Sequence, residues 1–140
     1  MSSEFQRMIE DRRLTRFRAD RNLILKEMRE AEADPNEAKD SLRRNKFKWT
    51  TIQGYYSMFH TARALVYTKN LREKSHYALL VALRDLWVGE LGTKLIEDFG
   101  NIMRLREEAD YGLTFSEAGA IETVEAAEAF FNRARAVLKP

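Results

Sequence analysis

The sequence predicts an all-α protein, a single antiparallel bundle of about five helices, and three observations support this prediction. The only prolines are Pro35 and the terminal Pro140, so long helices are permitted elsewhere. β-Branched residues are scattered and no apolar–polar alternation persists over four residues, so strand signals are nearly absent. Apolar residues instead recur at helical spacing along most of the chain. At 140 residues, one domain spanning residues 1–140 is expected.

The first two helices are expected on either side of a turn at Asp34-Pro35-Asn36, because this triplet combines turn-forming residues with a helix breaker. The first helix is expected to begin near Ser3, a suitable N-cap, and to end near Ala33. The second is expected over residues 37–69, and a short polar connection over residues 70–74 follows it.

Three further helices are expected in the remainder of the chain. Ser75 is a suitable N-cap for a helix over residues 76–87. The next helix, over about 90–110, is expected to end at Tyr111-Gly112, because glycine is common just after a helix C-terminus. Ser116 is expected to cap the last helix, in which apolar residues keep helical spacing.

The composition narrows the class of protein. A hydrophobic content of 44% and a charged content of 33% fit a folded globular protein better than a disordered one. Because cysteine is absent, disulfides, thiolate zinc sites and thiol nucleophiles are excluded. The first twenty residues carry five arginines and no apolar run, unlike a signal peptide, and no stretch is long enough to span a membrane. A cytoplasmic protein that needs neither a membrane nor a cofactor is expected.

The net charge of +2 conceals an uneven distribution. Residues 43–76 contain eight basic residues and one acidic residue, Glu73, which gives this segment a net charge of +7. The segments on either side of it are close to neutral or acidic. Such a basic block can attract a polyanion or the acidic surface of a protein partner.

The centre of the basic block carries two helical stripes. One is apolar and is expected to face the core: Tyr55, Phe59, Ala62 and Val66. The other has the same spacing one position further on: Tyr56, His60, Arg63 and Tyr67. Aromatic rings with cations nearby suit nucleotides and RNA. The alternative interpretation is a bundle helix whose flank happens to be aromatic.

Few other residues suggest chemistry. The two histidines, His60 and His76, lie on different predicted elements, so no metal site is expected. Arg106 and Asp110 lie one helical turn apart near a helix end and are candidate site residues. The alternative interpretation is that they form a surface ion pair. At the first position of its helix, His76 should prefer the neutral form, because the helix dipole disfavours a positive charge there.

Three segments in this order resemble the HEPN domain, a small helical domain named for its occurrence in higher eukaryotes and prokaryotes. They are GYYSMFHTARAL at 54–65, KSH at 74–76 and LREEADYG at 105–112. The match is to the small stand-alone prokaryotic branch of the family, and it covers most of residues 36–138. The resemblance implies a bundle of four to five helices that often forms a homodimer. It also implies frequent pairing with a small nucleotidyltransferase-like protein in toxin–antitoxin modules.

Many HEPN domains are metal-independent endoribonucleases that use an arginine followed, after four to six residues, by a histidine. Here that pattern is degenerate, because Tyr111, Gly112 and Leu113 stand where the histidine would follow Arg106. Asp110 is a poor proton donor at neutral pH. Proton transfer would therefore require His60 or His76 to lie beside Arg106 in the cleft. On this interpretation the candidate catalytic residues are Arg106, Asp110, His60 and His76.

The leading functional prediction is a HEPN-type protein that binds RNA or a nucleotide, as a dimer, within a toxin–antitoxin or related defence module. The expected phosphate contacts are Arg63, Lys74, Arg104 and Arg106. Tyr56 and Tyr111 are expected to stack on bases or to form hydrogen bonds. One alternative is a metal-independent endoribonuclease toxin. The other is a protein that only binds a nucleotidyltransferase-like partner and contacts no nucleic acid.

Overall fold

The computed structural model describes residues 2–110 and 115–138, and describes the side chains of all of these except residues 108–110. In this part of the chain, helices dominate and a single two-stranded sheet accompanies them. The elements follow one another as α1 (Ser3–Glu10), β1 (Leu14–Arg16), α2 (Arg21–Arg43), α3 (Phe47–Tyr67), β2 (Leu71–Glu73), α4 (His76–Leu86), α5 (Val88–Leu91), α6 (Thr93–Asp110) and α7 (Glu117–Leu138). The predicted all-α fold class is confirmed.

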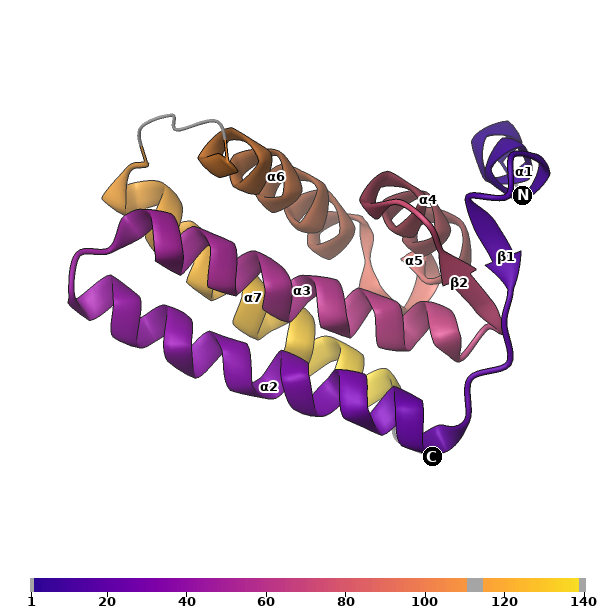
Figure 1. The fold of residues 1–140 in the computed structure, drawn as a ribbon, viewed down its shortest axis with the longest axis horizontal. Coiled ribbons are helices and arrows are strands. Elements are labelled where there is room, and N and C mark those ends of the chain that lie inside the picture. The colour runs from indigo at the N-terminus through magenta and orange to yellow at the C-terminus, as the bar shows by residue number, and fades with distance from the viewer. Residues whose placement is uncertain (1, 111–114, 139–140) are drawn as a thin grey trace.

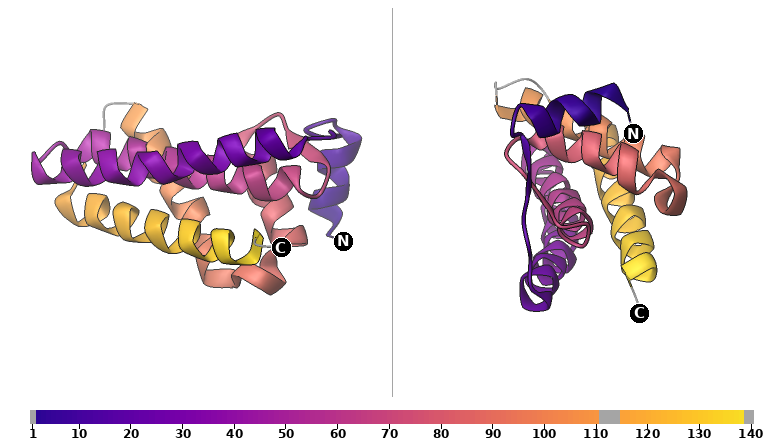
Figure 2. Two further views of the ribbon diagram at one scale, coloured as in Figure 1. Left: turned by 90° about the horizontal axis from the view of Figure 1, so that it is seen from below. Right: turned by 90° about the vertical axis from the view of Figure 1, so that its right-hand side faces the viewer.

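The helix α3 is the centre of the fold, since it contacts α2, α4, α6 and α7. The helices α2 and α3 lie side by side and antiparallel (Figure 1). The helix α7 runs along this pair (Figure 2). The largest fully buried side chains include Tyr55 of α3, Phe99 of α6 and Phe130 of α7. The core therefore lies between these three helices and α4, which adds Leu79 and Leu83.

The predicted turn at Asp34-Pro35-Asn36 is wrong, because α2 continues through it and Pro35 is buried inside the helix. A proline in a helix leaves the carbonyl four residues earlier without its usual donor. Here that carbonyl belongs to Ala31, and the Ser57 hydroxyl of α3 donates a hydrogen bond to it at 2.8 Å. The neighbouring helix thus replaces the missing backbone hydrogen bond.

The first predicted helix, from Ser3 to Ala33, is also wrong, because α1 ends at Glu10 and β1 precedes α2. Arg12 adopts a φ of 58° at the break. The strands β1 and β2 pair antiparallel, with Leu14 opposite Glu73 and Arg16 opposite Leu71. Each strand has three residues, which is too short for a recognisable alternation in the sequence.

The predicted second helix, over residues 37–69, is wrong at its start, because residues 37–43 belong to α2 and α3 begins at Phe47, after Asn45 with a φ of 59°. The later helices are close to their predicted positions. The Ser75 side chain accepts a hydrogen bond from Ala78 N–H and so caps α4 as predicted. The predicted helix over 90–110 is divided into α5 and α6 by Gly92, whose φ is 85°. Its predicted end at Tyr111-Gly112 lies outside the described residues.

Gly54 of α3 packs closely against Thr123 of α7. A Cβ atom at this position would lie 2.5 Å from Cγ2 of Thr123 in α7. Only glycine therefore allows the two helices to approach this closely. Among the described residues, no helix combines the length and the apolar character that crossing a membrane requires.

Candidate functional site

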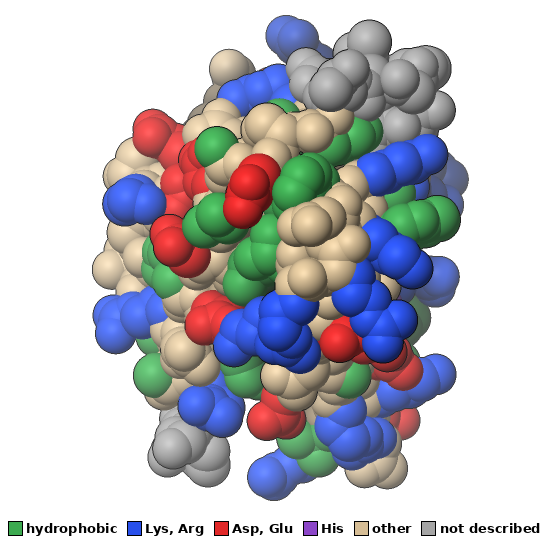
Figure 3. Space-filling model, turned by 90° about the vertical axis from the view of Figure 1, so that its left-hand side faces the viewer, with side chains coloured by type: hydrophobic (Ala, Val, Ile, Leu, Met, Phe, Trp, Pro, Cys, Tyr) green, Lys and Arg blue, Asp and Glu red, His purple; other side chains and the backbone are tan. Residues whose placement is uncertain are grey.

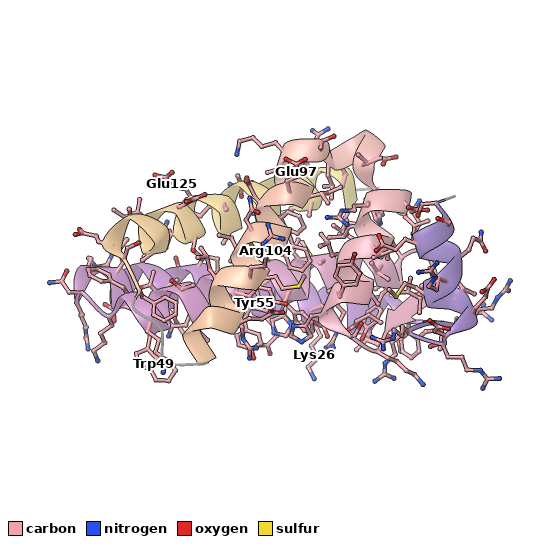
Figure 4. The ribbon with its side chains drawn as sticks, turned by 90° about the horizontal axis from the view of Figure 1, so that it is seen from above. Lys26, Trp49, Tyr55, Glu97, Arg104 and Glu125 are labelled. Carbon is pink, nitrogen blue, oxygen red and sulfur yellow. The ribbon has the colours of Figure 1, made fainter. Side chains whose placement is uncertain are left out.

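The helices α3, α4 and α6 meet at a group of aromatic rings. The ring of Tyr55 stacks on Phe99 with centroids 5.9 Å apart and planes within 2°. The imidazole of His76, the first residue of α4, lies 4.6 Å from the ring of Phe59 and 5.7 Å from that of Tyr55. Figure 4 shows Tyr55 beside α6, the helix that carries Arg104. The polar groups of the site pack against these rings.

Arg106 connects α6 to α3 at this point. Its Nη2 donates a hydrogen bond to the Tyr56 hydroxyl at 2.9 Å. Its guanidinium carbon lies 5.5 Å from the centroid of Tyr56 and 5.9 Å from that of Tyr55, within the range of a cation–π contact. The side chain is half-buried. Tyr55, Tyr56, Phe59, His76 and Arg106 are called the aromatic–arginine cluster below.

His76 enters the cluster through a short hydrogen bond, with Nδ1 2.6 Å from the Tyr55 hydroxyl. Burial, and then the positive charge of Arg106, lower the pKa of His76 from its ordinary value of 6.5. The imidazole is therefore mostly neutral at pH 7, as the sequence predicted, although burial is the largest cause. Burial also raises the pKa of the Tyr55 hydroxyl, which stays protonated at neutral pH.

This shift predicts how stability depends on pH. Because the folded state holds His76 with a lowered pKa, the unfolded chain takes up its proton first as the pH falls. The free energy of unfolding should decrease as the pH drops below about 6.5 and should level off below the folded-state pKa. Urea denaturation at pH 7.5, 6.5 and 5.5 measures this, and His76→Gln should show a smaller decrease. Parallel profiles for the two proteins would contradict it.

A second polar group lies on the side of α3 that faces α2 and β2. His60 Nδ1 lies 2.6 Å from Glu27 Oε2 of α2. Arg63 donates to Glu73 Oε2 of β2 from Nη2 at 2.8 Å and from Nε at 3.2 Å, and its Nη1 lies 3.5 Å from Glu27. Burial acting alone would raise the pKa of Glu27, but the His60 hydrogen bond and the charges of His60 and Arg63 outweigh it and lower the pKa. His60 and Arg63 are thus held by internal carboxylates.

Of the residues predicted from the sequence, the structure brings Tyr56, His76 and Arg106 together. Arg104 is exposed and donates to Asn101. Because residues two apart on a helix do not share a face, Arg104 points away from Arg106. Lys74 is exposed at the end of β2. The Asp110 side chain and all of Tyr111 lie outside the described residues.

The sequence did not identify Glu27, Tyr55 or Glu73 as parts of either polar group. Glu73 carried one signal, since it is the only acidic residue in the basic block 43–76. The apolar stripe predicted to face the core includes Tyr55, and its ring is fully buried. Its hydroxyl nevertheless reaches His76, so one residue serves both the core and the site.

The basic block is divided in space. Most of the 21-residue helix α3 lies between two groups of basic residues: Arg43, Arg44, Lys46 and Lys48 before it or in its first turn, and Lys69, Arg72 and Lys74 after its end. A helix of this length spans about 30 Å. At the end where α2 turns into α3, lysine and arginine side chains alternate with acidic ones (Figure 3). The concentration of positive charge seen in the sequence is therefore distributed over both ends of the molecule.

No group of three or more His, Asp or Glu side chains within the described part of the chain is placed to hold a metal ion. The site offers instead a guanidinium, a neutral imidazole and two tyrosine hydroxyls. A guanidinium can bind a phosphate, and a neutral imidazole can accept or donate a proton.

The HEPN domain family model matches residues 25–140. The chain belongs to the HEPN domain family. The match begins inside α2, so α1 and β1 of this HEPN protein precede it.

A relative in Methanocaldococcus jannaschii carries the name "Putative toxin MJ0605". It is 32% identical over 116 residues, which cover 78% of this chain and 84% of the relative. The aromatic–arginine cluster lies entirely within the segment that matches the HEPN family.

Proposed function

We propose that this HEPN protein binds RNA or a nucleotide at the aromatic–arginine cluster, as a component of a toxin–antitoxin or related defence module. The observation that carries this proposal is the Arg106 guanidinium, held half-buried against Tyr55 and Tyr56 beside the imidazole of His76. A cation oriented by aromatic rings suits a phosphate whose neighbouring base stacks. The name of the archaeal relative supports the toxin module.

The other predicted residues take different roles in this proposal. Arg104 and Lys74 are exposed and add positive charge that steers a polyanion towards the cluster. The ion pairs of Arg63 with Glu73 and Glu27 favour a positioning role for Arg63 over a phosphate contact. A homodimer and a nucleotidyltransferase-like partner are further parts of the proposal and rest on family resemblance alone.

We expect single-stranded RNA to bind, with an affinity that falls steeply between about 50 and 200 mM salt. Arg106→Ala should weaken binding about tenfold or more, because it removes the cation of the cluster. Fluorescence anisotropy with a labelled RNA measures both effects. The matched control is Arg133→Ala, which removes an exposed arginine of α7 and should change the affinity less than about twofold at fixed salt.

Two results would contradict the proposal. One is binding that is undetectable at low salt or does not change with salt. The other is an equal loss of affinity in Arg106→Ala and Arg133→Ala. If a nucleotidyltransferase-like protein then copurified with no bound nucleotide, a protein that only binds such a partner would be favoured instead.

A second candidate function is metal-independent RNA cleavage, and one observation favours it. The histidine that is missing after Arg106 in the sequence has a counterpart in space, since His76 belongs to the same cluster as Arg106. His60 faces Glu27 instead. Cleavage without a metal needs a group that removes the proton from the 2′-hydroxyl and a cation that stabilises the phosphate. His76 and Arg106 would take these two roles.

A further inference from the structure

A hollow of about 910 Å³ lies where α1 meets the β1–β2 ribbon, away from the aromatic–arginine cluster. Phe5 and Leu14 in its lining are almost completely buried, whereas Phe17 and Leu71 are half-buried and leave part of their surface open. Its volume falls within the range of about 300–1,000 Å³ that is typical of small-molecule sites. Phe5, Leu14 and Phe17 precede the segment that matches the HEPN family.

The rim of this hollow is positively charged. Arg16, Arg18 and Lys69 contribute to the lining and are exposed, and none of the described lining residues is acidic. The ammonium of Lys69 also lies 4.6 Å from the ring centroid of Trp87, within the range of a cation–π contact. An apolar floor with three cations at its edge favours a ligand that has an apolar body and an anionic group.

Two further features distinguish a nucleotide from an acyl chain. The ring of Phe17 contacts Tyr67, 5.1 Å away, and the guanidinium carbon of Arg72, 5.2 Å away, and it is an aromatic part of the lining. Asn70 also lines the hollow, and its backbone carbonyl accepts a hydrogen bond from Phe17 N–H at 3.0 Å. An amide side chain can pair with the edge of a base, whereas an acyl chain offers it no partner.

We propose that this hollow binds a nucleotide unit, with its base against Phe17 and its phosphate near Arg16, Arg18 and Lys69. This site goes beyond the proposed function, because it shares no residue with the aromatic–arginine cluster. The nucleotide unit can be a free nucleotide or one residue of an RNA strand, and the two sources differ in how the phosphate continues.

Isothermal titration of the full chain at low salt tests this inference with four probes: AMP, a ten-residue oligoadenylate, inorganic phosphate and dodecanoate. The diagnostic variant is Ile9→Glu, which places a negative charge on the lining at a residue that is 38% exposed. Its matched control is Ile121→Glu on α7, where the exposure is 39%. Arg16→Ala/Arg18→Ala is a second variant that removes only exposed side chains. Circular dichroism confirms that each variant is folded.

In an Arg106→Ala background, which removes the binding expected at the aromatic–arginine cluster, we expect AMP or the oligoadenylate to bind. Binding should be at least tenfold weaker when Ile9→Glu or Arg16→Ala/Arg18→Ala is added to that background. Ile121→Glu should stay within twofold of the parent. Equal affinity of the site for AMP and for the oligoadenylate indicates a free nucleotide. At least tenfold tighter binding of the oligoadenylate, still lost in Ile9→Glu, indicates a strand.

Four results would overturn the inference. Inorganic phosphate could bind as well as AMP, dodecanoate could bind where AMP does not, both nucleic-acid probes could fail to bind, or Ile9→Glu could match Ile121→Glu. Arg106→Ala separates the two sites. If oligoadenylate binding is lost in Arg106→Ala and unchanged in Ile9→Glu, the proposed function stands and this second site does not exist.

Discussion

Arg63→Met should lower the free energy of unfolding by about 3 kcal/mol, because it leaves a buried carboxylate without its counter-ion. The Glu73 side chain is only 4% exposed and takes two hydrogen bonds from Arg63 through one oxygen. No donor among the described residues reaches its other oxygen. Glu27 also loses a partner but keeps His60. Chemical denaturation followed by circular dichroism measures the loss.

A comparison of Arg63→Met with the double variant shows whether the charge, and not the lost side-chain volume, causes this loss. Replacing a buried ion pair by apolar residues of similar size is often close to neutral. Arg63→Met/Glu73→Met should therefore be more stable than Arg63→Met alone. Arg104→Met is the matched control for an exposed arginine and should cost less than about 0.5 kcal/mol. Equal losses in Arg63→Met and Arg104→Met would mean that the Arg63–Glu73 pair contributes little.

The Arg63–Glu73 ion pair also lies next to the chain segment that leads to His76. Glu73 is the last residue of β2, and Ser75 caps α4 so that His76 is its first residue. Arg63 therefore connects the middle helix of the bundle to the strand that delivers His76. Substitutions that break the Arg63–Glu73 ion pair should therefore also alter the position of His76, although Glu73 and His76 lie on different elements.

The fold class and most helix positions could be predicted because they depend on local patterns. Ser75 caps α4 through a bond to a residue three positions away, and such a signal lies entirely in the local sequence. An equally local signal predicts a turn at Pro35, but Ser57 of another helix supplies the hydrogen bond that a proline removes. Nothing near Pro35 in the sequence indicates that donor.

The predicted stripe of Tyr56, His60 and Arg63 illustrates the same limit for the site. Helical spacing places the three residues along one side of α3. In the structure their polar groups reach three different elements: Arg106 of α6, Glu27 of α2 and Glu73 of β2. Periodicity specifies which side chains share a face, but their partners depend on how the other elements pack.

RNA cleavage provides the sharpest test of His76. If the second candidate function holds, the parent protein should cleave a mixed RNA pool in the presence of EDTA. His76→Ala should then lower the rate about a hundredfold or more, which is the usual contribution of a general base. In the tautomer in which Nδ1–H donates to the Tyr55 hydroxyl oxygen, Nε2 of His76 carries the lone pair that accepts a proton. The rate should rise with pH around a midpoint below 6.5, because burial lowers the pKa of His76.

The matched control for this test is His60→Ala, since His60 is the other histidine of the chain and is held by Glu27 away from Arg106. The His60→Ala variant should cleave RNA at a rate within about fivefold of the parent. Thermal denaturation shows whether this variant is folded. Tyr55→Phe keeps the ring that stacks on Phe99 but removes the hydroxyl that orients His76. It should lower the rate about tenfold, as expected of a positioning residue. If the parent does not cleave RNA, or if the two histidine variants lose activity equally, His76 is not the base, and the aromatic–arginine cluster is left with binding alone.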